Sequence, residues 1–295
     1  MVLGTWELRS TAPPSTKYQV PSTKYHLPRL HMPTPIAVID AFTTRPFAGN
    51  PAGVCVLDGQ RPAEWMQSVA RELNLSETAF LLRRGDGEWG LRWFTPADEE
   101  RLCGHATLAA AHHLWSSGRH PTGTLTRFHT LSGVLTATPG LHGIVLDFPN
   151  EAPTPIPVPA GLADALGATI VTAGQNRLDL FAELTDEPAV RGLAPSIERL
   201  DAFPVRGIVV TARAEPGREY DFVSRFFAPR CGITEDPVTG SAHCGLGPWW
   251  SARLGKDSLI GYQASARGGT VRVTVAGDRC KLEGTAVTIW TGELV

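Results

Sequence analysis

The sequence predicts an α+β fold built from two related halves, and three observations lead to this prediction. Many short apolar segments, broken by turns rich in Gly and Pro, indicate a fold with more strand than helix. The order of these segments in residues 35–148 recurs in residues 160–295, with one small-residue helix in each half. Between the halves, residues 149–159 hold five prolines in eleven positions, which is typical of a stiff linker.

A local pattern supports the duplication. Phe94-Thr95-Pro96 precedes a predicted helix start at Gly104, and Phe227-Ala228-Pro229 precedes another at Gly240. The two helix starts are 136 residues apart and the two Phe-x-Pro marks are 133 apart. Because both order and spacing repeat, we interpret the chain as a duplicated α+β domain.

The elements of the first half follow from their periodicity. Apolar runs rich in β-branched and aromatic residues predict strands at 36–42, 52–57, 77–83 and 88–95, and three more within 124–148. Trp65, Val69 and Leu73 recur at helical spacing, and Pro62 suits a first turn, so residues 62–73 are expected to be helical. A second helix opens at Gly104.

The second half repeats this order. We expect strands at 168–173 and 177–184, a helical stretch near 186–200, strands at 205–212 and 220–227, a helix from Gly240 and three closing strands. The final strand, at 280–290, can pack back against the first half, so the two halves need not be strictly sequential.

Residues 1–34 are predicted to lie outside the fold. They hold five prolines, and the pentapeptide PSTKY occurs at 14–18 and again at 21–25. Such a segment buries too little apolar surface to order itself. We therefore expect a disordered or non-native N-terminal extension.

Composition excludes several classes of function. With 27 basic and 29 acidic residues among 295, the net charge is −2, which does not suit a nucleic-acid-binding protein. No apolar run reaches the length of a membrane span, and the N-terminus lacks the apolar core of a signal peptide. The five cysteines include no CxxC pair, so neither a disulfide framework nor a structural zinc site is expected. These features favour a reduced, cytoplasmic enzyme.

The two helix starts suggest a ligand site. Each offers free backbone N–H groups and the positive end of a helix dipole, and glycine allows a ligand to approach closely. His105 and Ser241 add side-chain donors next to Gly104 and Gly240. If the starts face one cleft, the pair would bind a small carboxylate.

Four sequence blocks resemble a known family. GNPAGV (49–54), LNLSETAF (73–80), CGHATLAAA (103–111) and EDPVTGSAHC (235–244) are similar to the signature blocks of PhzF-like proteins of phenazine biosynthesis. The resemblance covers residues 35–295. It implies a diaminopimelate-epimerase-like fold, in which each half is a barrel-like sheet around a central helix, and it implies a homodimer. It also implies cofactor-independent proton transfer on a small carboxylic acid.

The resemblance assigns roles to residues of these blocks. Glu77 would be the acid/base, with His105 and Asp236 as its catalytic partners. The substrate-binding positions would be Asn50, Gly104, Gly240, Ser241 and Ala242.

The chemistry of these residues is compatible with the roles. Glu77 begins an apolar strand, where burial would favour the protonated acid and prepare the carboxyl for proton transfer; an exposed strand edge is the alternative. The helix start disfavours a charged His105, so a neutral imidazole is expected. Asp236 could orient substrate or cap a turn, and Ser241 could satisfy backbone donors instead.

One departure bears on mechanism. Two-base epimerases of this fold carry a cysteine at each helix entrance, whereas here the positions hold Cys103 and Thr239. A threonine hydroxyl is too weak an acid or base near neutral pH. We therefore expect a one-carboxyl isomerase. A racemase or epimerase that uses Cys103, and a binding protein without turnover, remain the alternatives.

No metal or bound cofactor is expected. His105 and His112 are seven residues apart, about 10 Å along a helix, which is too far for one ion. The sequence contains no GxSxG, no Walker A motif and no GxGxxG after a strand.

Overall fold

The computed structural model describes residues 33–295. Residues 1–32 of the predicted extension lie outside the described residues, so that expectation stays a prediction for them. The predicted end of this extension, at residue 34, is wrong, because Thr34 is buried and begins strand β1. The first strand therefore starts two residues earlier than the apolar run at 36–42 predicted.

Two sets of elements follow one another along the chain. The first half contains, in order, β1 (Thr34–Ala41), β2 (Asn50–Leu57), α1 (Ala63–Leu73), β3 (Glu77–Gly85), β4 (Glu88–Phe94), β5 (Glu99–Glu100), α2 (Gly104–Ser116), β6 (Thr126–Thr130), β7 (Gly133–Pro139) and β8 (Ile144–Pro149). The rest contains β9 (Thr154–Ile156), α3 (Leu162–Leu166), β10 (Ile170–Gln175), β11 (Asp179–Leu184), α4 (Glu187–Arg191), α5 (Ile197–Asp201), β12 (Gly207–Arg213), β13 (Phe222–Phe227), the 3₁₀ turn η1 (Pro229–Cys231), α6 (Gly240–Leu254), β14 (Ser258–Gln263), β15 (Gly269–Ala276), β16 (Arg279–Gly284) and β17 (Ala286–Leu294).

Strand pairing repeats between the halves. In the first half β1–β2 is antiparallel, β2–β3 parallel, β3–β4 antiparallel, β4–β6 parallel, and β6–β7 and β7–β8 antiparallel. The strands β10 to β16 make the same six pairings in the same order and with the same directions. Two such matched sets are the structural counterpart of the repeat seen in the sequence.

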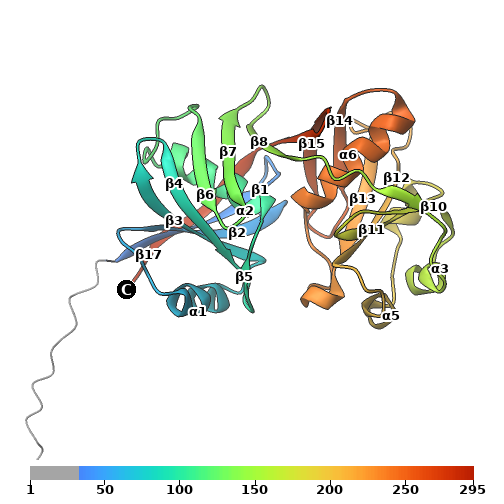
Figure 1. Ribbon diagram of the computed structural model, residues 1–295, viewed down its shortest axis with the longest axis horizontal. Helices are drawn as coiled ribbons and strands as arrows, with labels where there is room; N and C mark the ends of the chain where they lie inside the picture. The colour runs from blue at the N-terminus through green and yellow to red at the C-terminus, as the bar shows by residue number, and fades with distance from the viewer. Residues whose placement is uncertain (1–32) are drawn as a thin grey trace, which may run out of the picture. The chain divides into compact units, whose positions relative to one another are not determined.

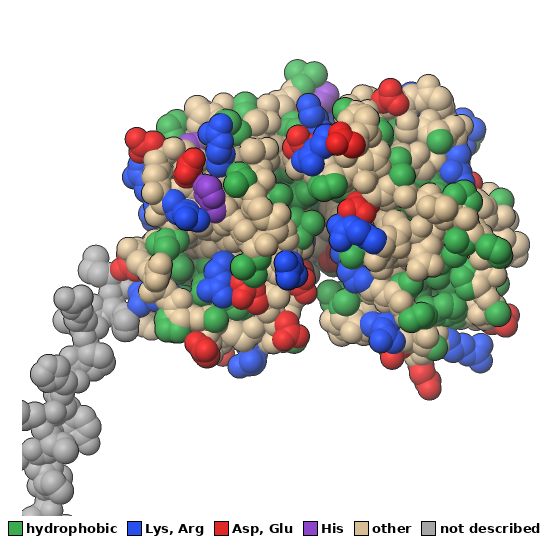
Figure 2. Space-filling view, viewed as in Figure 1, with side chains coloured by type: hydrophobic (Ala, Val, Ile, Leu, Met, Phe, Trp, Pro, Cys, Tyr) green, Lys and Arg blue, Asp and Glu red, His purple; other side chains and the backbone are tan. Residues whose placement is uncertain are grey.

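The halves are joined by strands that cross between them. β8 pairs with β16, so the two sets form one continuous sheet. After β8 the chain enters the second half, where β9 pairs with β10, and after β16 it returns to the first, where β17 pairs with β1 along its whole length. Figure 1 shows the C-terminal strand running back among the first strands of the chain, and Figure 2 shows the surface hollowed between the halves.

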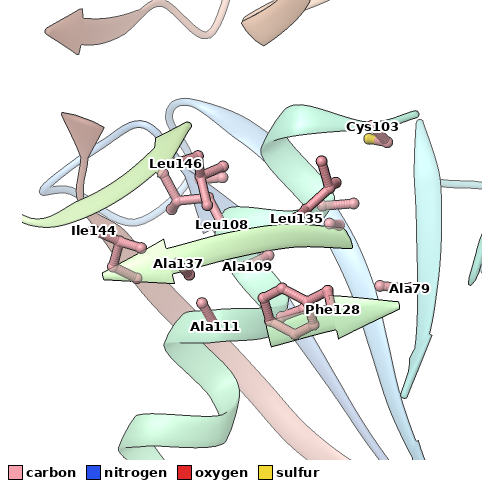
Figure 3. Packing of buried hydrophobic residues seen from close by; sticks show 14 of the residues in the cluster. Ala79, Cys103, Leu108, Ala109, Ala111, Phe128, Leu135, Ala137, Ile144 and Leu146 are labelled. Carbon is pink, nitrogen blue, oxygen red and sulfur yellow. The ribbon is translucent and has the colours of Figure 1, made fainter. Parts of the chain in front are cut away.

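In each half the sheet wraps around one central helix. The first core surrounds α2, whose alanines 106 and 109–111 are fully buried against strands β1, β2, β3 and β8. Figure 3 shows Ala109 and Ala111 of α2 among Phe128, Leu135 and Leu146 of the surrounding strands. Alanine allows the sheet backbone to close around the helix at short distance. In the second half, α6 packs in the same way on β14, β15 and β16. No helix within residues 33–295 is long and apolar enough to cross a membrane.

Several predicted elements need correction. The helical stretch near 186–200 is two short helices, α4 and α5, because Gly192 ends the first and Pro195-Ser196 starts the second. The segment 149–159 is not only a linker, since Thr154–Ile156 forms strand β9 at a sheet edge, where proline is tolerated. The short elements β5 and α3 carry too little periodicity to be recognised in the sequence.

Candidate active site

The site lies where the two central helices begin. A Cβ atom added to Gly104 would lie 3.4 Å from the Cα of Gly240, so the two helix starts nearly touch. Beside them is a cavity of about 80 Å³ lined by residues of both halves: Glu77, Glu100, Leu102, Cys103, Gly104, His105, Arg206, Phe226, Ala228, Cys231, Ile233, Asp236, Thr239, Gly240 and Ser241. The free N–H ends of two helices therefore face one small space, as the sequence led us to expect.

Glu77 and His105 form the centre of the site. Glu77 is the first residue of β3, and His105 is the second residue of α2. Their Oε2 and Nε2 atoms are 3.1 Å apart, and the side chains are only 13% and 5% exposed. At this distance the two atoms form an ion pair when the ring is charged, and neither atom has another partner among the described residues. Both residues line the cavity, which places their side chains beside the space for a ligand.

The ring of His105 is held from its other nitrogen. Nδ1 lies 3.2 Å from Asn50 Nδ2 and 3.6 Å from Cys103 Sγ. Burial opposes a charged ring, but Cys103 and Glu77 outweigh it and raise the pKa of His105 well above its ordinary value. This direction runs against the neutral imidazole expected at a helix start, since the charge of Glu77 lies beside the ring.

Asp236 is buried behind the histidine. It accepts hydrogen bonds from Asn50 Nδ2, at 2.8 Å, and from the Thr239 hydroxyl. Burial raises the pKa of Asp236 to about 6, with the charge of Glu77 adding to it and His105 opposing it. The carboxyl accepts from side chains, while the backbone N–H of Thr239 donates to Gln263 Oε1, so Asp236 belongs to the polar network of the site rather than capping a turn.

Arg206 is a site residue that the sequence did not reveal. It precedes β12, forms a two-pronged ion pair with Asp179, which is fully buried, and donates from Nη2 to Ser241 Oγ at 2.9 Å. Because the Ser241 oxygen accepts this bond, its own hydroxyl proton is free to be donated to a ligand. The only signal in the sequence is an arginine before a predicted strand, which is too common to single it out.

The site is asymmetric across the duplication. Thr78 pairs with Phe94 in the first half and Ile208 with Phe227 in the second, so Gly207 is the counterpart of Glu77. A side chain at 207 would collide with the ring of Phe226, which fills that place. Only the first half supplies a carboxyl at this position.

The two helix entrances also differ. Burial raises the pKa of Cys103 to about 11, so the thiol stays protonated at neutral pH. The hydroxyl of Thr239 donates to Asp236 and lies 3.2 Å from Gln263 Nε2. Neither helix start therefore holds a side chain that can readily accept a proton at neutral pH.

Two expected binding residues do not line the cavity. Asn50 is fully buried and orients His105 and Asp236. The side chain of Ala242 packs in the apolar cluster around α6. The structure brings the others together, namely Glu77, Gly104, His105, Asp236, Gly240 and Ser241, and adds Glu100, whose burial and proximity to Glu77 raise its pKa.

One group within residues 33–295 offers metal-ligand atoms within 4.8 Å of one another: Glu77, Cys103 and His105. Zinc would be the ion suited to carboxylate, thiolate and imidazole donors. However, Glu77 approaches Nε2 of the ring while Cys103 approaches Nδ1, so an ion bound at one nitrogen is turned away from the other ligand. The trio fits a proton-transfer network better than a metal centre.

Comparison with known proteins is consistent with this geometry. The family model described as phenazine biosynthesis-like protein matches residues 39–292. The chain belongs to this family. An uncharacterized isomerase of Halalkalibacterium halodurans is 49% identical over 90% of this chain and 99% of its own. The human phenazine biosynthesis-like domain-containing protein is 39% identical over 89% of this chain and 99% of its own.

Solved structures confirm the fold class. A PhzF-family protein of Enterococcus faecalis superposes with a TM-score of 0.85 at 42% identity, covering 90% of this chain and all of that one. A hydroxyproline epimerase of Agrobacterium vitis, only 13% identical, shares the fold with a TM-score of 0.57 over 90% of this chain and 93% of its own. The phenazine biosynthesis-like family thus has the two-half fold that the repeat predicted, and it is the epimerase-like fold that the family resemblance implied.

Proposed function

We propose that the protein is an isomerase that moves a proton between two carbons of a small carboxylic acid by one-carboxyl acid/base catalysis, without a cofactor. The observation that carries this proposal is the asymmetry of the cavity. Glu77 stands beside His105 on one side, whereas its counterpart position, Gly207, is closed by Phe226. A single carboxyl suffices to take a proton from one carbon and return it to another on the same face.

In this mechanism each group has a distinct task. The substrate carboxylate binds the N–H groups at Gly104 and Gly240 and the hydroxyl of Ser241. Glu77, whose Oε2 lies 3.1 Å from Nε2 of His105, removes a proton from a carbon next to the unsaturated system. The electron pair moves towards the bound carboxylate, where the helix ends stabilise the charge. The proton then returns to a second carbon from Glu77 or from Nε2 of His105.

A racemase mechanism has less support. It needs a base on each face of the carbon, and the two entrances offer a thiol with a pKa of about 11 and a threonine whose hydroxyl is already donated to Asp236. A binding protein without turnover would need the helix ends but not a carboxyl beside an imidazole.

The test is exchange of carbon-bound hydrogen for deuterium. The full chain is incubated in heavy water with a panel of small unsaturated and hydroxy carboxylic acids, and loss of C–H signal is followed by NMR. Glu77→Gln keeps the shape but loses the titratable group, so exchange should fall by about 10²–10⁴-fold. Cys103→Ala, two residues before His105, is the matched variant that should retain it.

The alternatives give opposite results. Exchange that survives Glu77→Gln and disappears in Cys103→Ala would establish the racemase. Binding of an acid without exchange by the wild-type protein would establish a binding protein.

A further inference from the structure

A second cavity adjoins the catalytic one. It measures about 400 Å³, is more open to solvent, and shares Arg206 and Cys231 with the catalytic cavity. We refer to it as the arginine vestibule; its lining residues are Gln175, Arg177, Leu178, Pro204, Val205, Arg206, Arg230 and Cys231. A ligand in the catalytic cavity that extends past Arg206 enters this vestibule.

The vestibule is basic. Three arginines line it and no acidic side chain does. Arg177 pairs with Glu151 and Arg206 with Asp179, whereas Arg230 has no carboxylate partner among residues 33–295 and only a 3.4 Å contact with the backbone carbonyl of Asp201. One arginine charge is therefore left unneutralised at this wall.

Arg206 also has unused donors. Its Nε and Nη2 atoms bond Asp179 and Ser241, and the two N–H bonds of Nη1 have no partner within the described part of the chain. Since Asp179 and Ser241 hold the guanidinium plane in place, these N–H bonds are oriented before a ligand arrives.

The catalytic cavity, unlike the vestibule, carries acidic side chains. The segment that precedes α2 reads Ala97-Asp98-Glu99-Glu100, and Glu100 lines the catalytic cavity; its counterpart before α6 carries Arg230. Glu77 and Glu100 repel a second negative group, which is attracted towards Arg206 and Arg230. The small catalytic cavity, about 80 Å³, has room for the reacting end of a ligand and little more.

We propose that the substrate carries a second anionic group, a carboxylate or a phosphate, which binds Arg230 and the free edge of Arg206 in the vestibule while the reacting carbons lie beside Glu77. This inference rests on the proposed function, because it assumes that a first carboxylate binds at the helix starts.

The test compares matched ligands by calorimetry on the full chain. A series of unsaturated dicarboxylates from glutaconate upward is titrated, each against the monocarboxylate that lacks only the distal carboxyl group, starting with crotonate; 4-phosphonocrotonate provides the phosphorus anion. The best dicarboxylate or the phosphonate should bind about fivefold tighter than its monocarboxylate, the upper range for a partly exposed ion pair. The second anionic group of the substrate is identified as the one, carboxylate or phosphonate, that increases the affinity more.

The variants decide where the gain arises. Arg230→Gln should remove the extra affinity for dianions and leave monocarboxylate binding unchanged. Arg230→Lys should retain most of the extra affinity. Arg83 is an exposed arginine on β3, so the control variant Arg83→Gln should have no effect. Extra affinity that persists in Arg230→Gln, or no gain for any dianion, would overturn the vestibule assignment.

The same titrations separate this inference from the proposed function. Monocarboxylate binding that Ser241→Ala does not weaken would contradict the carboxylate site at the helix starts. The deuterium-exchange assay is independent of these titrations. If Glu77→Gln loses exchange but no dianion binds more tightly than its monocarboxylate, the isomerase proposal stands and only the vestibule assignment fails.

Discussion

Glu77 and Gly207 occupy equivalent places in the two halves, and the difference between them decides which half performs chemistry. The carboxyl of Glu77 lies beside the imidazole of His105, whereas the ring of Phe226 fills the space next to Gly207. A duplicated fold would be expected to supply two similar groups. Here four of the seven titratable residues that line the cavity come from the first half, namely Glu77, Glu100, Cys103 and His105.

A prediction at the residue scale concerns Thr239. Its hydroxyl donates to buried Asp236, which favours the charged carboxylate. Thr239→Val should therefore raise the pKa of Asp236 further, and lower the free energy of unfolding by about 1–3 kcal/mol near pH 8, where the carboxyl is ionised. Near pH 5, below the pKa of about 6, the carboxyl is protonated and the loss should be smaller.

Urea unfolding at the two pH values and an NMR titration of the carboxyl carbon measure both effects. Thr274→Val, at an exposed strand position, is the control. A stability loss that is equal at both pH values would show that the hydroxyl acts by packing alone.

At the scale of elements, the helices α2 and α6 are built to be enclosed. Small residues occupy their first turns and buried faces, and this allows both the sheet to wrap closely and the two N-termini to meet. Neither helix start has a side-chain cap, so N–H groups that a serine or aspartate would normally satisfy are free for a ligand.

Gly240→Val tests this arrangement. The added side chain would press on Gly104 and Leu282, each within 3.5 Å of the new Cβ, and push the helix starts apart. We expect a loss of about 1–3 kcal/mol in the free energy of unfolding. Proton exchange should fall roughly 10²-fold, because displacement of the anion site misplaces the substrate.

Thermal unfolding and the deuterium-exchange assay check this result. Gly59→Val has open space around the new side chain and serves as the matched control. Full activity in Gly240→Val would argue against substrate binding between the helix ends.

At the scale of the whole molecule, the two halves depend on each other through exchanged strands. β17 comes from the end of the chain and pairs with eight residues of β1, and β8 pairs with β16. The first half therefore lacks an edge strand until the second half has been added.

Residues 33–152 expressed alone should consequently fail to fold, because β1 exposes unpaired backbone groups and its apolar face loses its cover. Joining residues 285–295 to this fragment through a flexible linker should restore part of the structure. Circular dichroism and amide exchange measure both outcomes. A fragment 33–152 that unfolds cooperatively on its own would contradict this dependence.

A second whole-molecule prediction is a homodimer, as the family resemblance implies. Light scattering at micromolar concentration should give twice the chain mass of 31.7 kDa. A mass equal to one chain would reject it.

The sequence by itself predicted the duplication, most strands and both central helices, because each leaves a local trace: apolar periodicity, a Phe-x-Pro mark, a glycine at a helix start. The candidates Glu77, His105, Asp236 and Ser241 came from sequence blocks that resemble a known family. The last strand was expected to pack on the first half, and β17 pairs with β1 there. The tertiary structure alone decided how Arg206 reaches Ser241 and that Gly207 is the closed counterpart of Glu77. These features depend on contacts between residues far apart in the chain. Such contacts are fixed by sheet closure and by the burial of charge, and neither one produces a pattern within a short stretch of sequence.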